Sequence, residues 1–179
     1  MKHLFIALFF LLFGVTTIKV KAQNSTYDLV IYGGTSGGVA AAIQMSRMGK
    51  SVILIEPSNH LGGLTTGGLG ATDIGNKDVI GGISREFYQN IMDYYKDPST
   101  WKYEDRLAYL SRPDQTRSNE GEDAMWTFEP SVAMKIYNEM LAAEDITLVI
   151  GKRLNRQSGV NAQNNKIISI TMESGETYS

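Results

Sequence analysis

Short apolar runs alternate with segments of helical spacing in the first third of the chain. Residues 27–32 and 51–56 are apolar almost throughout, which is typical of strands buried on both faces of a parallel sheet. Between them, residues 37–48 place small and apolar side chains on one helical face, and Gly49 follows where a helix commonly ends. This order of strand, glycine-rich turn, helix and strand predicts a βαβ unit with a right-handed crossover.

The alternation continues in the second half of the chain. Residues 83–96 and 130–143 have helical spacing, the latter opened by a proline, and residues 146–150 are a third apolar strand. Residues 98–129 are polar and irregular, with short helical pieces expected around residues 107–110. A connection of that length inside a compact domain is usually functional or mobile.

After the third strand the pattern changes to antiparallel pairing. Residues 153–158 and 166–172 are predicted to form a hairpin around residues 161–165. Buried strands separated by helices, followed by such a hairpin, predict a three-layer α/β fold. Its centre is a parallel sheet, and a β-meander follows the third strand.

The first residues have the pattern of a secretory signal peptide. A basic start at Lys2 precedes the apolar residues 4–15, and residues 20–22 (VKA) place small or compact residues at the two positions that a signal peptidase reads. We expect cleavage after residues 1–22, export to the periplasm or the outside, and no stable membrane span afterwards. An uncleaved membrane anchor is the alternative. Cleavage removes three lysines and changes the formal net charge from −2 to −5.

The amino-acid composition argues against several kinds of partner and cofactor. Hydrophobic residues make up 42% of the chain and charged residues 20%, as in ordinary globular domains, and no stretch gathers Lys and Arg, so no nucleic-acid partner is expected. The chain has no Cys, which excludes disulfides, a reactive dithiol and iron–sulfur ligands from its own residues. His60 is the single His after residue 22, so no metal site is expected.

The most informative segment is the glycine-rich turn between the first strand and the first helix. A dinucleotide pyrophosphate binds at a helix N-terminus, and glycines allow its close approach and the packing of the helix on the strand. Thr35 occupies the middle position of the fingerprint, where a glycine is usual. The residues expected to contact the pyrophosphate are Gly33, Gly34, Thr35, Ser36, Gly37 and Gly38.

Glu56 ends the second strand at the distance where the ribose-binding carboxylate of such folds belongs. A carboxylate accepts hydrogen bonds from ribose hydroxyls and repels a 2′-phosphate. The segment therefore predicts binding of an unphosphorylated adenosine dinucleotide. A glycine-rich turn in an unrelated α/β domain is the alternative.

A second glycine-rich stretch, residues 60–70, follows the acidic strand end and favours FAD over NAD, because an NAD domain usually enters its next helix there. The motifs VIYGGTSGGVAAA, LIEPSNHLGG, TTGGLG and TFEPSVAMKIYNEML resemble the exported FAD-dependent oxidoreductases that are related to the flavoprotein component of heterodisulfide reductase. The resemblance covers most of the chain after residue 26, and this family tolerates a Thr in the fingerprint.

The resemblance implies a Rossmann-like FAD-binding domain at residues 23–179, with its C-terminal part missing. It implies that Gly62 and Gly63 run along the pyrophosphate and ribityl chain, that the Thr66 hydroxyl contacts the cofactor, and that the backbone of Leu154 meets the adenine. The flavin ring and a small-molecule substrate would mostly be held by residues that follow. No catalytic residue is assigned, and such a fragment alone is expected to be inactive.

Two other functions stay open: an NAD-binding dehydrogenase, and a secreted carbohydrate-associated protein with a degenerate dinucleotide domain, which Thr35 would favour. His60 is either a base or a positioning residue. Trp101, Tyr103 and Trp126 either line a substrate cleft or pin the long connection to the core. The substrate, the electron acceptor and the oligomeric state are not indicated.

Overall fold

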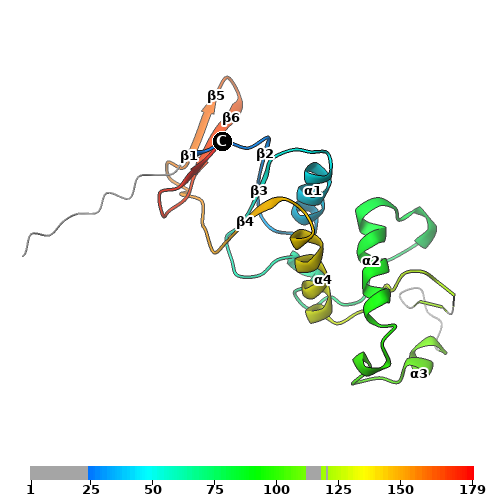
Figure 1. Ribbon diagram of the computed structural model, residues 1–179. Helices are drawn as coiled ribbons and strands as arrows, with labels where there is room; N and C mark the ends of the chain where they lie inside the picture. Colours follow the sequence, from blue (N-terminus) through cyan, green and yellow to red (C-terminus); the bar gives the residue numbers. More distant parts are fainter. Residues whose placement is uncertain (1–23, 112–117, 120) are drawn as a thin grey trace, which may run out of the picture.

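The computed structural model describes residues 24–111, 118–119 and 121–179. Its centre is a parallel three-stranded sheet in the order β2 (Leu29–Tyr32), β3 (Val52–Glu56) and β4 (Ile146–Ile150) (Figure 1). Every residue of β3 is buried, as the continuous apolar run predicts for a central strand. The three predicted strands are therefore confirmed, and the signal peptide predicted at residues 1–22 lies outside the described residues.

Helices cover one face of this sheet. Helix α1 (Ser36–Arg47) lies against β3, and α2 (Gly82–Tyr94) and α4 (Pro130–Ala142) pack together with it. The predicted inner face of α1 is buried, with Val39, Ala42 and Ile43 fully inaccessible to solvent. Each such apolar side chain contributes about 1.5–3 kcal/mol by leaving water, apart from the smaller alanine.

The opposite face of the sheet is covered by a second sheet. Its order is β1 (Asn24–Ser25), β7 (Thr177–Tyr178), β6 (Lys166–Thr171) and β5 (Val160–Gln163), with β1 parallel to β7 and the other pairs antiparallel. Alternate residues of β3 face the two layers, since side chains of a strand alternate. Val52 and Leu54 join the core under the helices, whereas Ile53 and Ile55 pack against Ile170, Met172 and Tyr178. The predicted three-layer α/β arrangement with a β-meander is confirmed.

The predicted position of the hairpin's first strand was wrong. Residues 153–158 form a turn in which Asn155 Oδ1 accepts the N–H groups of Gln157 and Ser158, and the strand is β5 instead. The hairpin turns at Asn164 and Asn165, whose φ angles of 49° and 60° lie in the left-handed region that Asn tolerates. Two consecutive residues of this kind make the tight turn that matches strand twist.

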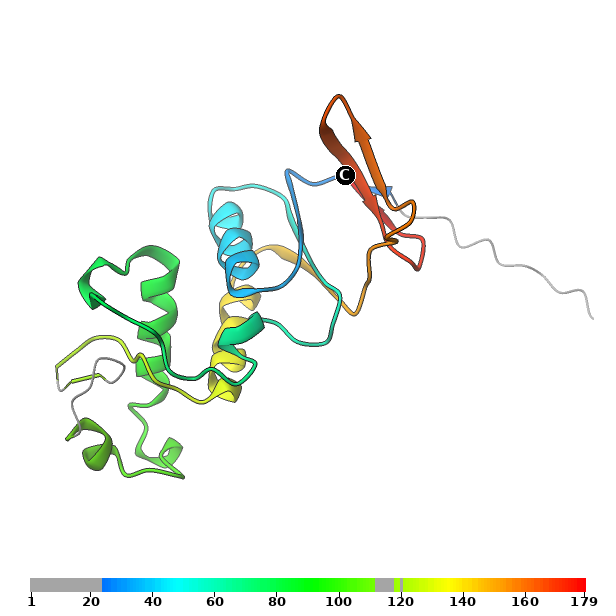
Figure 2. The ribbon, with the colours of Figure 1, turned by 180° about the vertical axis from the view of Figure 1, so that it is seen from behind.

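The long connection contains short helices. Between α2 and α4 lie the 3₁₀ turn η3 (Pro98–Thr100) and α3 (Arg106–Leu110), and two more 3₁₀ turns, η1 (Gly63–Thr65) and η2 (Lys77–Val79), precede α2. From behind, α2, α3 and this connection extend away from the sheet, on the far side of α4 from the meander (Figure 2). In the part of the chain that the structure describes, no helix has the length and apolarity needed to cross a bilayer.

Candidate functional site

The loop between β2 and α1 lies at the carboxyl end of the parallel sheet. Gly33 has a φ of 115°, a value that favours glycine, and its N–H donates to the Ile55 carbonyl oxygen at 2.8 Å. The chain thus turns off β2 while it stays bonded to β3, and α1 begins at Ser36. In open α/β sheets, ligands bind at this edge, beside the N-terminus of the crossover helix.

The N-terminus of α1 presents an unpaired backbone donor. The ladder of helical hydrogen bonds begins where the Val39 N–H donates to the Thr35 carbonyl at 2.8 Å. Among the described residues, the Gly37 N–H has no acceptor, the Ser36 N–H faces the Gly62 carbonyl in the bridge between Thr35 and Gly62, and the first turn carries no acidic side chain. Free N–H groups and the positive end of the helix dipole together favour an anion such as a phosphate.

The glycines of the loop have two different roles. A Cβ at Gly38 would lie 2.1 Å from the Gly33 carbonyl oxygen, and one at Gly34 would lie 2.4 Å from Leu61 Cδ2, so both positions are needed for packing. A Cβ at Gly33 would meet nothing within 4 Å, and one at Gly37 only Thr35 Oγ1 at 3.9 Å. These two glycines keep the surface above the turn open to a ligand.

Thr35 is the N-cap residue of α1. Its hydroxyl oxygen accepts the Gly38 N–H at 3.3 Å, and its backbone is extended, with φ −67° and ψ 171°. No left-handed conformation is required at this position, so a residue with a side chain fits without strain. A threonine in the middle of the fingerprint therefore caps the helix and leaves the site intact.

Glu56 connects the end of β3 to both loops. Its Oε2 accepts the Gly34 N–H at 2.7 Å, and its Oε1 accepts the Ser58 N–H at 2.7 Å and the Ser58 hydroxyl at 2.6 Å. Burial alone would raise the pKa of Glu56, but the hydrogen bonds from Ser58 and Gly34 outweigh it, with a smaller contribution from His60, and lower the pKa. The group is thus held as a carboxylate, and its Oε2 keeps a lone pair for a further donor.

The second glycine-rich loop is hydrogen-bonded to the first. The Gly62 N–H donates to the Gly34 carbonyl at 2.6 Å, and the Ser36 hydroxyl donates to the Gly62 carbonyl at 2.9 Å. Gly62 has a φ of 89°, and a Cβ there would lie 2.8 Å from Tyr137 Cδ2; Gly63 has a φ of 56° and lies beside Thr35. The structure therefore brings the two predicted glycine segments together around the N-terminus of α1.

The two neighbouring threonines of this loop point to different places. The Thr66 hydroxyl is buried, donates to the Leu61 carbonyl and lies 2.8 Å from His60 Nε2. The Thr65 hydroxyl lies 2.7 Å from Ser36 Oγ, at the N-terminus of α1. The sequence analysis named Thr66 and not Thr65, because spacing alone does not show which side of the 3₁₀ turn faces the helix.

A small cavity adjoins these hydroxyls. It has a volume of about 190 Å³, and its lining includes Ser36, Gly37, Thr65 and Tyr137. Burial raises the pKa of Tyr137, and interactions with the Ser36 and Thr65 hydroxyls offset part of that rise. The phenol therefore stays protonated at neutral pH and adds a donor to this side of the loop.

Leu154 lies at the same edge of the sheet, after β4. Its N–H donates to the Tyr32 hydroxyl at 3.0 Å, and it forms an isolated bridge with Met172. In residues 24–111, 118–119 and 121–179, no group donates to the Leu154 carbonyl. This carbonyl is available as an acceptor for a base.

The remaining candidates are His60 and the aromatic residues of the long connection. The Thr66 hydroxyl has one proton, which goes to Leu61, so His60 Nε2 is the donor in their contact. His60 is exposed, and its contact with Thr66 lies within its own loop. Trp126 is buried and donates to Glu122 at 2.9 Å, so it anchors the long connection, whereas Trp101 and the 88% exposed Tyr103 line a cavity. No cluster of His, Cys, Asp or Glu able to hold a metal occurs in the described part of the chain.

A parallel sheet that ends in a glycine-lined helix N-terminus, with a carboxylate on the next strand, defines a dinucleotide-binding α/β protein. Residues 28–179 match the family model described as FAD dependent oxidoreductase. The chain belongs to this FAD-dependent oxidoreductase family, and FAD is its cofactor.

A curated relative shares a short stretch of sequence with this chain, and two solved structures share its fold. A vinyl phenol reductase of Lactiplantibacillus plantarum is 41% identical over 54 residues, which are 29% of this chain and 11% of that protein. A geranylgeranyl bacteriochlorophyll reductase-like protein of Thermoplasma acidophilum superposes with a TM-score of 0.50 at 15% identity, over 87% of this chain and 37% of its own. An L-amino acid deaminase of Proteus vulgaris that lacks its specific insertion gives a TM-score of 0.50 at 14% identity, over 89% of this chain and 53% of its own. The chain thus spans only part of each of these proteins.

Proposed function

We propose that this chain is the FAD-binding portion of an exported oxidoreductase that acts on a small molecule. The observation that carries the proposal is the N-terminus of α1, where the unpaired Gly37 N–H and the open space above Gly33 and Gly37 lie next to a buried carboxylate, Glu56. An adenosine dinucleotide supplies a pyrophosphate for the first feature and ribose hydroxyls for the second.

Each predicted residue except Thr66, whose hydroxyl donates to Leu61, has a proposed contact. Gly33 to Gly38 receive the pyrophosphate, Glu56 the adenosine ribose, and the Leu154 carbonyl the adenine. Gly62 and Gly63 line the path toward the ribityl chain. Bound FAD supplies the electron-transfer chemistry, and the residues of this chain bind and orient it.

We further propose a relationship to the heterodisulfide reductase-like flavoproteins, and export after cleavage of residues 1–22. The glycine-rich motifs and TFEPSVAMKIYNEML support the first, and the apolar segment before VKA supports the second. Catalytic residues and the substrate pocket would then belong to parts of the protein beyond this chain.

The geometry of Thr35 speaks against a degenerate dinucleotide domain, because the residue caps α1 without strain. An NAD-binding dehydrogenase is distinguished from the proposed function by the bound nucleotide. The test is to purify the full-length protein, record its visible absorption, and identify the nucleotide released by denaturation with chromatography and mass spectrometry. FAD is the expected result. Release of NAD, or no flavin uptake at micromolar FAD, would contradict the proposal.

A further inference from the structure

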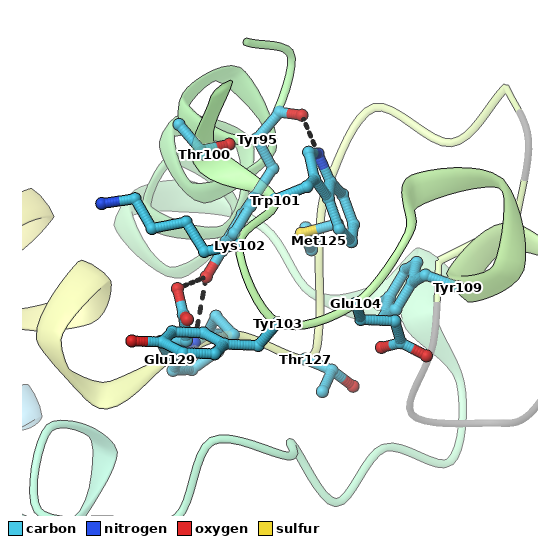
Figure 3. Close-up of a pocket in the computed structure, with 11 residues that line it drawn as sticks. Tyr95, Thr100, Trp101, Lys102, Tyr103, Glu104, Tyr109, Met125, Thr127 and Glu129 are labelled. Atoms are coloured by element: carbon cyan, nitrogen blue, oxygen red, sulfur yellow. Dashed lines mark hydrogen bonds between the residues drawn. The ribbon is translucent and has the colours of Figure 1, made fainter. Parts of the chain in front are cut away.

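A second cavity lies in the connection between α2 and α4, and it shares no residue with the FAD loops (Figure 3). Its volume is about 210 Å³, which suits a ligand smaller than a typical drug molecule. Met125 and Phe128 contribute its buried apolar floor, at 2% and 7% exposure. Nothing in the dinucleotide site accounts for this cavity.

Aromatic rings form its walls. The indole N–H of Trp101 donates to the Tyr95 carbonyl at 2.9 Å, which fixes the ring, and the Trp101 and Tyr109 ring centroids are 5.3 Å apart at an angle of 56°. Figure 3 shows Tyr103 extending along the opposite side of the same space. Rings that converge on one cavity offer the negative faces of several π-systems to a ligand.

The cavity lining holds one carboxylate oxygen without a partner in the described part of the chain. Glu129 Oε2 accepts the Tyr95 hydroxyl at 2.7 Å, and its Oε1 has no partner among the described residues. Glu104 also lines the cavity. The lining includes one cationic side chain, Lys102, and its ammonium group points away from Trp101 and Met125 (Figure 3). The free Glu129 oxygen beside the aromatic rings therefore favours a cation.

We propose that this cavity binds a small organic cation of the alkylated ammonium class. Such a cation is attracted by aromatic faces within about 6 Å, and the methyl groups around its charge suit an apolar floor. The unpaired oxygen of Glu129 supplies the countercharge. This proposal does not depend on FAD binding, because its residues lie outside the loops around α1.

The wall of the cavity continues into the cofactor loop. The Phe128 N–H donates to the Gly70 carbonyl at 2.8 Å, and Ala71 and Thr127 form an antiparallel bridge. A Cβ at Gly70 would lie 2.1 Å from the Phe128 carbonyl oxygen, so this contact is close. The cation site is thus built on the segment that follows the FAD-binding glycines.

The first experiment compares two probes of the same shape by isothermal titration calorimetry on the full chain. Choline carries a quaternary ammonium, and 3,3-dimethylbutan-1-ol is its uncharged analogue. Choline is expected to bind with a Kd of about 1 mM or lower, and the analogue at least about tenfold more weakly. Equal affinity for both probes, or no binding of choline up to about 10 mM, would overturn the proposal.

Variants then locate the binding. Glu129→Gln is expected to weaken choline binding about tenfold, whereas Glu139→Gln removes an exposed carboxylate of α4 outside the cavity and should leave the Kd unchanged. Tyr103→Ala is expected to weaken binding about threefold or more. Because Tyr103 is 88% exposed, that variant should keep the thermal stability of the parent. A similar loss from Glu129→Gln and Glu139→Gln would show a general charge effect and reject the site.

Discussion

The carbonyl oxygen of Gly33 occupies the space into which any side chain at Gly38 would extend, since a Cβ there would lie 2.1 Å from it. The contact joins the end of β2 to the first turn of α1 across five positions of sequence. It sets how closely the helix approaches the sheet and, through that, where its free N–H group points. One missing side chain thus links the packing of the fold to the geometry of the cofactor site.

Gly38→Val should therefore impair both stability and flavin content. Overpacking of this kind costs about 1–3 kcal/mol, and the outward shift of α1 misdirects the free N–H group of Gly37. We expect the full-length variant to be purified with little or no flavin. The matched control is Gly37→Ala, which adds a methyl group in open space and should leave the free energy of unfolding unchanged or slightly higher. Equal destabilisation by the two changes would contradict this interpretation of Gly38.

Glu56→Ala should weaken FAD binding about ten- to a hundredfold, which corresponds to about 1.5–3 kcal/mol for hydrogen bonds to a charged group. Fluorescence titration of the apoprotein with FAD measures the change. Asp28→Asn is the control, because Asp28 bonds to Ser51 at the opposite end of the sheet and should not affect affinity. Unchanged affinity in a folded Glu56→Ala protein would place the ribose contact elsewhere.

The lowered pKa of Glu56 predicts a pH dependence of stability. A carboxyl group whose pKa is lower in the folded state stabilises the fold at pH values above its unfolded pKa, near 4.5, and this contribution is lost as the pH falls through the folded value. In Glu56→Gln, an amide NH₂ must face a backbone donor, so the variant should be less stable at pH 7. Denaturant unfolding at pH 7, 5 and 3.5 should show this difference shrinking toward acid. A constant difference would indicate that the charge is not responsible.

Export is tested on the protein recovered from the source cell. We expect Gln23 at the N-terminus of the exported protein, by N-terminal sequencing or mass spectrometry. The physical reason is that residues 4–15 are an apolar run too short to span a bilayer comfortably, followed by compact residues at the cleavage positions. Intact Met1 on a membrane-integrated protein would favour the uncleaved anchor instead.

The sequence predicted the elements whose burial is strong and missed those whose burial is weak. Strand β3 is buried on both faces, so its apolar run was unambiguous, and the inner face of α1 repeated with helical spacing. Strand β5 is exposed at every position, so no alternation of buried and exposed residues distinguishes it. The strand was therefore predicted at residues 153–158 instead. The turn residues Asn164 and Asn165 carried a better signal, because paired left-handed residues define a tight hairpin.

The glycine segments and Glu56 could be predicted because pyrophosphate and ribose impose residue types at fixed spacing. The aromatic cavity could be predicted only in part, because Trp101 and Tyr103 were candidates for lining a cleft, whereas only the tertiary fold brings Tyr95, Tyr109 and Phe128 to them. The same limit applies to side-chain direction within a loop, where one residue separates a buried hydroxyl from one that faces the helix.

That difference between Thr65 and Thr66 gives the last prediction. Ser36 donates its hydroxyl proton to Gly62, so Thr65 is the donor in their contact and its remaining lone pair is free to accept from a ribityl hydroxyl. Thr65→Val should therefore weaken FAD binding about three- to tenfold, with little change in the free energy of unfolding.

Thr66→Val should do the reverse. It removes the buried hydroxyl that bonds to Leu61 and His60, which costs about 1–3 kcal/mol of stability, while the direct contacts to the cofactor remain. FAD titration and denaturant unfolding of both variants, which are isosteric changes at adjacent positions, separate the two roles. If Thr66→Val lowers FAD affinity at unchanged stability, the hydroxyl contact predicted from the sequence is correct, and Thr65 only supports the loop.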